Sequence, residues 1–262
     1  MLPINEAKPF ALPRETASLL LDIAVLQLRC GAYTERVNRN VKRFARALGY
    51  ELELFFSFSS VALTLQDQRH TITLFRHVEI HGGIKLSVLI GISRLSWRAQ
   101  KEKLSVDEIR KEVHRLEESS PYPFPLVVTL VSLACASLAR LFGASASVML
   151  MTAFATVAAL VARSTLQKRG FNIFIVVTCS AFVAATVSSA GVRLSIGNAP
   201  HLAIATSVLF LIPGAPLINA VIDHIDGHIL VGVARGIMGT VIAFAIALGM
   251  LIALNLQGLE QP

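Results

Sequence analysis

The sequence Leu209-Phe210-Leu211-Ile212-Pro213-Gly214-Ala215-Pro216-Leu217-Ile218-Asn219-Ala220-Val221-Ile222-Asp223 is an apolar run that proline and glycine interrupt. After the interruption it resumes with Asn219 and Asp223 four residues apart, on one helical face. Proline lacks an amide hydrogen, and in lipid a broken helix persists only where protein or a water-filled cavity satisfies the freed backbone groups. Many transporters build substrate sites from broken helices with polar residues beside the break. The stretch therefore predicts a membrane transport subunit, with this segment at or near its pathway.

Charge is unevenly distributed along the chain. Of its 262 residues, 54% are hydrophobic and 16% are charged, whereas soluble domains are typically about 25% charged. Residues 1–120 hold 18 of the 24 Lys and Arg and 14 of the 17 Asp and Glu. Three prolines follow, at positions 121, 123 and 125, and they end any preceding helix. We therefore expect a cytoplasmic α+β domain over 1–120 and a transmembrane domain over 121–262.

The composition also argues against several classes of protein. The net charge of +7 does not indicate nucleic-acid binding, because the basic residues are mixed with acids and no stacking motif accompanies them. The first fourteen residues contain three prolines and no apolar core, so we expect no secretory signal peptide. The cysteines, Cys30, Cys135 and Cys179, have neither disulfide-framework nor zinc spacing. No Walker-type ATP loop is present, so we expect transport energy to come from ion or substrate gradients, as in a secondary transporter. We do not expect an enzyme.

The first 120 residues change their apolar period along the chain. Helical periodicity predicts helices over 15–29 and 35–48, with Thr34 as N-cap of the second and Gly49 after its end. Alternation of apolar and polar residues then predicts strands over 51–58, 61–65 and 71–75. A helix follows Gly82-Gly83 to about residue 100, and Ser105 with Glu108 forms a capping box that starts a helix over 106–118. The pattern predicts an α+β domain.

The remaining sequence predicts an all-α membrane bundle of five transmembrane helices, the fourth of them broken. A span needs about 20 mostly apolar residues. Segments of that kind lie near 125–142, 146–162, 171–191, 202–222 and 229–254. Arg163, Lys168 and Arg169 cluster between the second and third spans, which places that loop and the N-terminus in the cytoplasm by the positive-inside rule. Five spans then place the C-terminus on the outer side of the membrane.

Six residues around the break are candidates for the substrate pathway. They are Pro213, Gly214, Pro216, Asn219, Asp223 and Arg235. A half-helix that starts at Pro216 would present free amides and a partial positive charge to an anion, although a simple proline kink is the alternative. Charges at membrane depth are normally paired or functional. Asp223 and Arg235 could therefore form a structural pair between the fourth and fifth spans. Alternatively, Arg235 binds a substrate carboxylate while Asp223 takes a proton.

The histidines do not predict a metal site. His224 and His228 have i, i+4 spacing, but Gly227 weakens a helix between them. His77, Glu79 and His81 alternate along one predicted strand face, where a solvated surface is the simpler interpretation. Cys30 lacks an identifiable base for a nucleophilic role. We expect neither a metal nor a cofactor.

Two motifs resemble one protein family. The segment Pro213-Gly214-Ala215-Pro216-Leu217-Ile218-Asn219-Ala220, followed by Asp223, Gly227, Gly232 and Arg235, is similar to the signature of the threonine/serine exporter (ThrE) family. Gly31-Ala32-Tyr33-Thr34-Glu35-Arg36-Val37 is similar to its N-terminal motif. The resemblance covers nearly the whole chain.

The resemblance implies function and partners. One cytoplasmic domain followed by one set of spans is similar to the split form of the family, in which a YjjP-like larger subunit works with a small YjjB-like membrane subunit. It implies a hetero-oligomer in membrane lipid that exports either small carboxylates such as succinate or the amino acids threonine and serine. A membrane-anchored sensor or enzyme that acts through residues 1–120 is the rival interpretation.

Overall fold

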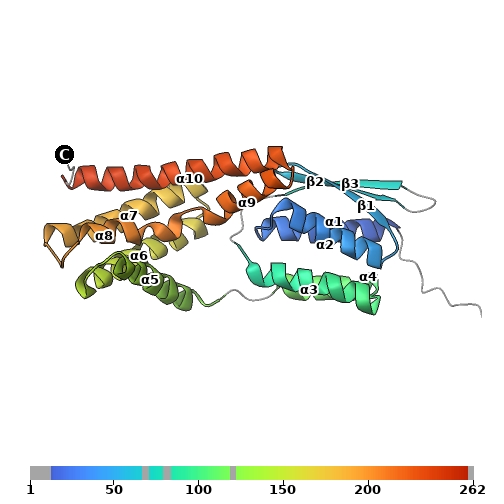
Figure 1. Ribbon diagram of the computed structural model, residues 1–262, viewed down its shortest axis with the longest axis horizontal. Coiled ribbons are helices and arrows are strands. Elements are labelled where there is room, and N and C mark those ends of the chain that lie inside the picture. Colours follow the sequence, from blue (N-terminus) through green and yellow to red (C-terminus); the bar gives the residue numbers. More distant parts are fainter. Residues whose placement is uncertain (1–12, 67–70, 79–83, 119–121, 259–262) are drawn as a thin grey trace, which may run out of the picture. The chain divides into compact units, whose positions relative to one another are not determined.

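The computed structural model describes residues 13–66, 71–78, 84–118 and 122–258 and is mostly helical, with one small sheet (Figure 1). It divides into two compact units. The first comprises Met1–Ser120 together with Ala215–Gly236, and the second comprises Pro121–Gly214 together with Ile237–Pro262. A segment from the C-terminal half of the sequence thus completes the first unit.

Four helices of the first unit come from the N-terminal part of the chain: α1 (Pro13–Arg29), α2 (Thr34–Ala47), α3 (Leu86–Glu102) and α4 (Val106–Glu117). The helices α2, α3 and α4 each bury one face, whereas α1 is buried on nearly all sides. In α2 the buried face includes Val37, Val41 and Phe44, at the three- and four-residue spacing of a helix. The hydrophobic core of the unit also takes in Val231 from the C-terminal segment. Burial of these faces explains why the periodicity predicted the helices.

The sheet has three antiparallel strands in the order β1 (Glu51–Phe56), β2 (Ser60–Gln66) and β3 (Thr71–His77). Leu54, Leu63 and Leu74 lie opposite one another across the three strands. Val61, Leu63 and Leu65 alternate toward the core, where α1 packs on β2 and β3. The predicted strands are therefore present, with bounds that differ by one or two residues.

Two predicted helix starts have different outcomes. The capping box at Ser105 is confirmed, since the Ser105 hydroxyl accepts from the Glu108 amide and the Glu108 carboxylate accepts from the Ser105 amide. The prediction for Thr34 was wrong. Tyr33 occupies the N-cap position without a side-chain cap, and Thr34 is the first helical residue. The acceptor for the Thr34 amide comes from elsewhere in the chain, as described below.

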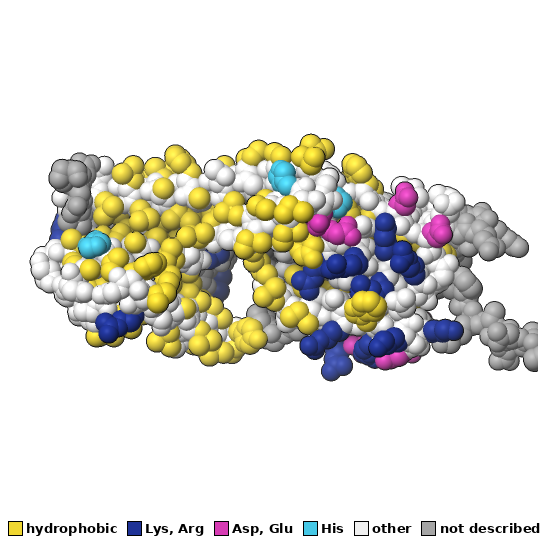
Figure 2. Space-filling model, in the orientation of Figure 1, with side chains coloured by type: hydrophobic (Ala, Val, Ile, Leu, Met, Phe, Trp, Pro, Cys, Tyr) yellow, Lys and Arg dark blue, Asp and Glu magenta, His cyan; other side chains and the backbone are white. Residues whose placement is uncertain are grey.

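The second unit contains the apolar helices α5 (Phe124–Leu141), α6 (Ala146–Lys168), α7 (Ile173–Arg193) and α8 (His201–Ser207), the short 3-10 helix η1 (Leu209–Leu211) and most of α10 (Ile229–Leu256). Hydrophobic side chains gather over these helices in Figure 2. Among the described residues, four helices are long and apolar enough to cross a membrane: α5, α6, α7 and α10. A fifth span results if the bent pair His201–Leu211 and Gly214–Ile225 counts as one.

The fourth predicted span is broken, as the sequence indicated. Helical structure ends at Leu211, and α9 (Gly214–Ile225) begins after Pro213 at an angle of 56° to the preceding segment. Pro213 separates the two halves because it cannot continue the helical hydrogen-bond pattern. The second half starts at Gly214, two residues earlier than the predicted start at Pro216, which instead lies in the first turn of α9.

Small residues let the helices of the second unit approach closely. Ala159 on α6 and both Ala181 and Ala184 on α7 are fully buried in one cluster. A Cβ atom added to Gly249 of α10 would lie 3.1 Å from the Phe182 amide nitrogen of α7, closer than side chains normally approach. Close approach through small residues is typical of helices that pack in lipid.

Candidate functional site

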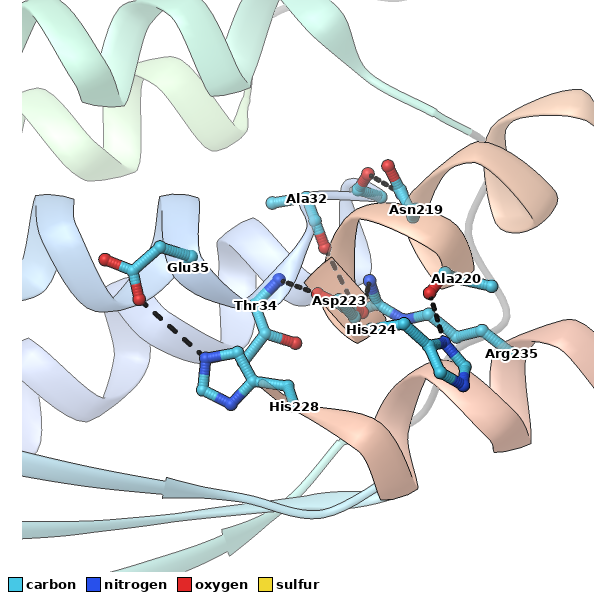
Figure 3. A network of polar contacts seen from close by, with 10 residues as sticks. Ala32, Thr34, Glu35, Asn219, Ala220, Asp223, His224, His228 and Arg235 are labelled. Atoms are coloured by element: carbon cyan, nitrogen blue, oxygen red, sulfur yellow. Dashed lines mark hydrogen bonds and ion pairs between the residues drawn. The ribbon is translucent and has the colours of Figure 1, made fainter. Parts of the chain in front are cut away.

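The candidate site lies within the first unit, where the hairpin of α9 and α10 meets the loop between α1 and α2 (Figure 3). This loop, residues 30–33, joins Arg29 at the end of α1 to Thr34 at the start of α2. Gly31 has a φ of +87°, a left-handed conformation that glycine adopts without strain. The turn directs the carbonyl groups of the loop and the first amide of α2 toward the hairpin (Figure 3).

Asp223 is the centre of the site. Its side chain is fully buried, and each carboxylate oxygen has a partner. Oδ1 accepts a 2.8 Å hydrogen bond from the backbone amide of Thr34, and Oδ2 accepts a 2.7 Å hydrogen bond from Nη1 of Arg235. A carboxylate at a helix N-terminus accepts a hydrogen bond from a free amide and interacts favourably with the positive end of the helix dipole. Asp223 therefore caps α2 from 189 positions away in sequence.

Arg235 and Asn219 hold the same loop by its carbonyl groups. Nη2 of Arg235 donates to the Ala32 carbonyl over 3.1 Å, and Nδ2 of Asn219 donates to the Gly31 carbonyl over 2.9 Å. The Arg235 side chain is only 11% exposed. Asn219, Asp223 and Arg235 thus bind three consecutive peptide groups of the loop. They contact its backbone atoms and not its side chains.

The α9–α10 hairpin is tight because two glycines permit it. Gly227 turns the chain with a φ of +85°. A Cβ atom on Gly232 would lie 2.8 Å from the Ala220 carbonyl oxygen and would also meet the His224 ring. The His224 Nδ1 atom is 2.7 Å from that same carbonyl, which can only accept, so Nδ1 carries the proton. These contacts fix the spacing between Asp223 and Arg235.

A second, weaker contact joins the hairpin to α2. Nε2 of His228 lies 3.8 Å from a carboxylate oxygen of Glu35, and the His228 ring packs edge-on against Phe56. This contact becomes an ion pair when His228 is protonated.

The Thr34 hydroxyl is the unusual polar group of the site. The hydroxyl of Thr34 is buried and makes no hydrogen bond among the described residues, although its amide binds Asp223. Buried unsatisfied hydroxyls are uncommon in folded proteins and call for an explanation.

The structure brings the two members of the charged pair together, and their roles toward substrate and proton stay predictions. Asp223 and Arg235 contact each other directly, so the resting arrangement is a paired one. Asn219 joins them, whereas Pro213 and Gly214 belong to the second unit at the start of α9. Sequence reasoning missed the partner of the pair, which is the loop at residues 31–34. Both segments had been singled out as motifs, but nothing in their spacing connected them.

The histidine candidates form no metal centre in the described part of the chain. No group of three or more His, Cys, Asp or Glu side chains there could hold a metal ion. His224 and His228 instead contact a backbone carbonyl and Glu35. Of the strand set, His77 ends β3, while Glu79 and His81 lie outside the described residues.

The family described as "Putative threonine/serine exporter" matches residues 18–257, which include both the loop and the hairpin. The chain belongs to the threonine/serine exporter family. Two relatives are named "Probable succinate transporter subunit YjjP". The protein from Klebsiella aerogenes is 31% identical, over 94% of this chain and 96% of the relative. The protein from Escherichia coli strain K12 is 30% identical over the same shares. No solved structure matches the chain.

These similarities agree with the apolar helices. A threonine/serine exporter family member with four to five candidate spans is a multi-pass membrane transport protein. The family and the names of the relatives indicate a transporter and not an enzyme. Because both relatives are named as subunits, they also imply a partner chain for this type of protein.

Proposed function

We propose that this chain is one subunit of a secondary transporter of the bacterial inner membrane that exports small organic acids such as succinate. Its partner is a small YjjB-like membrane subunit. The names of the two relatives support the substrate class. The observation that carries the proposal is the buried Asp223–Arg235 pair, which holds the loop at residues 31–34 through backbone groups.

The contact between Asp223 and Arg235 is of a kind that a substrate or a proton can break. An arginine fork binds any carboxylate of suitable geometry, so a substrate carboxylate competes with Asp223 for Arg235. A proton that binds Oδ2 of Asp223 removes the negative charge and weakens its hold on Arg235, while Oδ1 still accepts from the Thr34 amide. Proton binding and substrate binding therefore favour the same change, which is release of Arg235 from Asp223. Proton and substrate would then leave the cell together, with the outward substrate gradient driving export.

The topology belongs to the same proposal. The N-terminal domain, residues 1–120, is cytoplasmic, and the C-terminus is periplasmic, in line with the positive-inside rule. The pathway residues are Pro213, Gly214 and Pro216 at the break, with Asn219, Asp223 and Arg235 beyond it.

Export from cells that lack the native systems tests the function. Cells express this chain with and without the small partner, and succinate, threonine and serine are measured outside. We expect succinate to appear only when both subunits are present. Absence of succinate, threonine and serine export under both conditions would refute the proposal.

Export of amino acids is the second candidate, because the matching family is described as a threonine/serine exporter. An amino acid also presents a carboxylate to Arg235, but it carries an ammonium group as well. If threonine or serine appears outside in the same experiment and succinate does not, the amino acids replace organic acids as the proposed substrates. The competition between a substrate carboxylate and Asp223 for Arg235 would still apply.

The variant Asp223→Asn tests proton coupling. The amide oxygen of asparagine can still accept from the Thr34 amide, but the side chain cannot be protonated in this pH range. We expect export, normalised to folded protein in the membrane, to lose its dependence on external and internal pH. An unchanged pH profile would exclude Asp223 as the proton carrier.

A further inference from the structure

The outer face of α2 is strongly basic. Its buried residues lie on one side of the helix, and the opposite side carries Arg36, Arg39, Lys42, Arg43 and Arg46 within about one third of the helix circumference. A soluble domain gains nothing in stability from such a run, because like charges three and four residues apart repel one another. The face therefore has a cost that folding alone does not explain.

The neighbouring helix α3 continues this face. Arg94, Arg98 and Lys101 are exposed on one side of α3, next to the exposed Trp97. Figure 2 shows the dark-blue side chains gathered over α2 and α3. These eight basic residues with Trp97 are called the α2–α3 basic face below.

Arg43 joins the two helices. It donates a 2.7 Å hydrogen bond to the hydroxyl of Ser96, and its guanidinium lies 3.8 Å from the centre of the Trp97 ring. Burial and the adjacent Arg39 lower the pKa of Arg43 below its usual value. The contact holds the indole in place, and the tryptophan nevertheless remains 53% exposed.

The described part of the chain leaves most of this face without a carboxylate partner. Among the described residues, Arg98 alone of the eight has a carboxylate in ion-pair range, at 3.3 Å from Glu102. Both groups of that pair are about half exposed, so the pair is weak. Of the remaining seven, Arg43 is held by Ser96 and Trp97, and the other six cations can meet carboxylates from outside this part of the chain.

The residue types indicate a protein partner. Six of the eight cations are arginine, whose planar fork matches a carboxylate with two parallel hydrogen bonds. Arginine and tryptophan are also the residues most enriched at the energetic centres of protein interfaces, where lysine is depleted. The arginine fork also fits phosphate, so the choice of a protein partner rests on the exposed Trp97 beside the arginines, a pairing typical of protein interfaces.

We propose that the α2–α3 basic face docks an acidic surface of the partner subunit. The inference rests on the proposed function only in taking that partner to exist. Charge complementarity supplies orientation and a fast association rate, and Trp97 supplies an apolar anchor at the centre of the face.

Charge reversal on α2 tests the docking. The full chain and the small membrane subunit are purified separately in detergent, and their dissociation constant is measured at 50 and 300 mM salt. We expect the variant Arg39→Glu/Arg46→Glu to weaken binding at least tenfold at the lower salt concentration. We also expect salt to weaken wild-type binding, because it screens exposed charges.

The matched control is Arg110→Glu/Arg115→Glu on α4, where both arginines are exposed and belong to another helix of the same unit. We expect the control to bind within about twofold of wild type. Both double variants should melt at the wild-type temperature or above it. Equal loss of binding in the two variants would overturn the assignment to the α2–α3 basic face.

A zero-length carbodiimide cross-linker identifies the contact directly, because it joins a lysine amine only to a carboxylate that touches it. We expect Lys42 and Lys101 to be linked to Asp or Glu residues of the small subunit. Links only to a second copy of this chain would overturn the inference, as would displacement of the small subunit by an RNA oligonucleotide or dependence of binding on anionic phospholipid.

The outcomes separate this inference from the proposed function. If Arg39→Glu/Arg46→Glu binds the subunit normally and exports succinate, the docking surface is wrong and the function stands. If the wild-type chain does not bind the small membrane subunit, both the docking surface and the two-subunit proposal are wrong.

Discussion

The charges of Asp223 and Arg235 stabilise each other because burial removes the water that would otherwise solvate them. Asp223 is fully buried and Arg235 nearly so. Removing one member of a buried pair leaves the other charge uncompensated, whereas removing both leaves none. The pair is therefore expected to show strong energetic coupling, whatever its role in transport.

A double-mutant cycle with Asp223→Asn and Arg235→Gln measures this coupling. Each single variant is expected to lose about 2 kcal/mol of stability, and the double variant less than the sum of the two. Thermal unfolding of the purified protein provides the measurement. Additive losses would show that the 2.7 Å contact contributes little to stability.

The buried hydroxyl of Thr34 gives the second residue-scale prediction. Because it has no partner among the described residues, Thr34→Val should melt at the wild-type temperature or slightly higher. Thr34→Ser keeps the hydroxyl and loses a buried methyl group, so it should melt lower, by about 1 kcal/mol of stability. A lower melting temperature for the valine variant would reveal a hydrogen-bond partner beyond the described residues.

The sequence predicted the chemistry of this site better than its geometry. A carboxylate and a cation in apolar sequence indicate pairing or function on solvation grounds alone, and Asp223 and Arg235 do pair. Thr34 was expected to cap α2 because threonine favours that position. Asp223 provides the acceptor instead, since its carboxylate reaches the Thr34 amide, and local sequence preferences contain no information about an acceptor 189 residues away.

At the scale of elements, the α9–α10 hairpin depends on the absence of a side chain at Gly232. A methyl group there would lie 2.8 Å from the Ala220 carbonyl, which belongs to the rigid backbone of α9. We expect Gly232→Ala to lower stability by about 1–3 kcal/mol because the two helices must separate.

Gly236→Ala is the matched control, one turn further along α10. Its added Cβ would lie 3.8 Å from the Ala220 side chain, which is an ordinary contact. This variant should be neutral or gain up to about 1 kcal/mol from its higher helix propensity. Equal melting temperatures for the two variants would mean that the hairpin is looser than the structure indicates.

Helices and strands were the most predictable level of the fold. The alternation of apolar and polar residues identified the three strands. Pro213, Gly214 and Pro216 together identified the break before α9. The bend of 56° was not predictable from sequence, because proline breaks the hydrogen-bond pattern without setting the angle of the chain that follows.

At the scale of the whole molecule, the orientation in the membrane can be tested by cysteine labelling. Gln167 lies within the basic cluster at the end of α6, and Leu194 follows the end of α7; both are exposed. If the chain has the proposed topology, an impermeant maleimide added outside intact cells should label Leu194→Cys but not Gln167→Cys. The reverse pattern would invert the topology.

The native cysteines need attention in that experiment. Burial raises the pKa of the Cys30 thiol, which keeps its reactive thiolate scarce. Cys135 is buried, but Cys179 is half-buried and is replaced by serine in the background strain. Wild-type protein with this one replacement serves as the unlabelled control.

The two-unit organisation was only partly accessible from sequence. Composition separates a charged region from an apolar one near residue 120, because burial in lipid selects against charge. Hydropathy could not reveal that residues 215–236 complete the first unit, because their apolar side chains suit a protein core as well as a bilayer.

The discontinuous first unit also has a consequence for biosynthesis. The ribosome makes residues 1–120 first, yet the acceptor that caps α2 and the Val231 side chain in the core are made only after α5, α6 and α7. The N-terminal domain is therefore completed after those helices have emerged. A chain that ends before Asp223 also lacks Val231, so its N-terminal domain has an uncapped helix and a gap in its core.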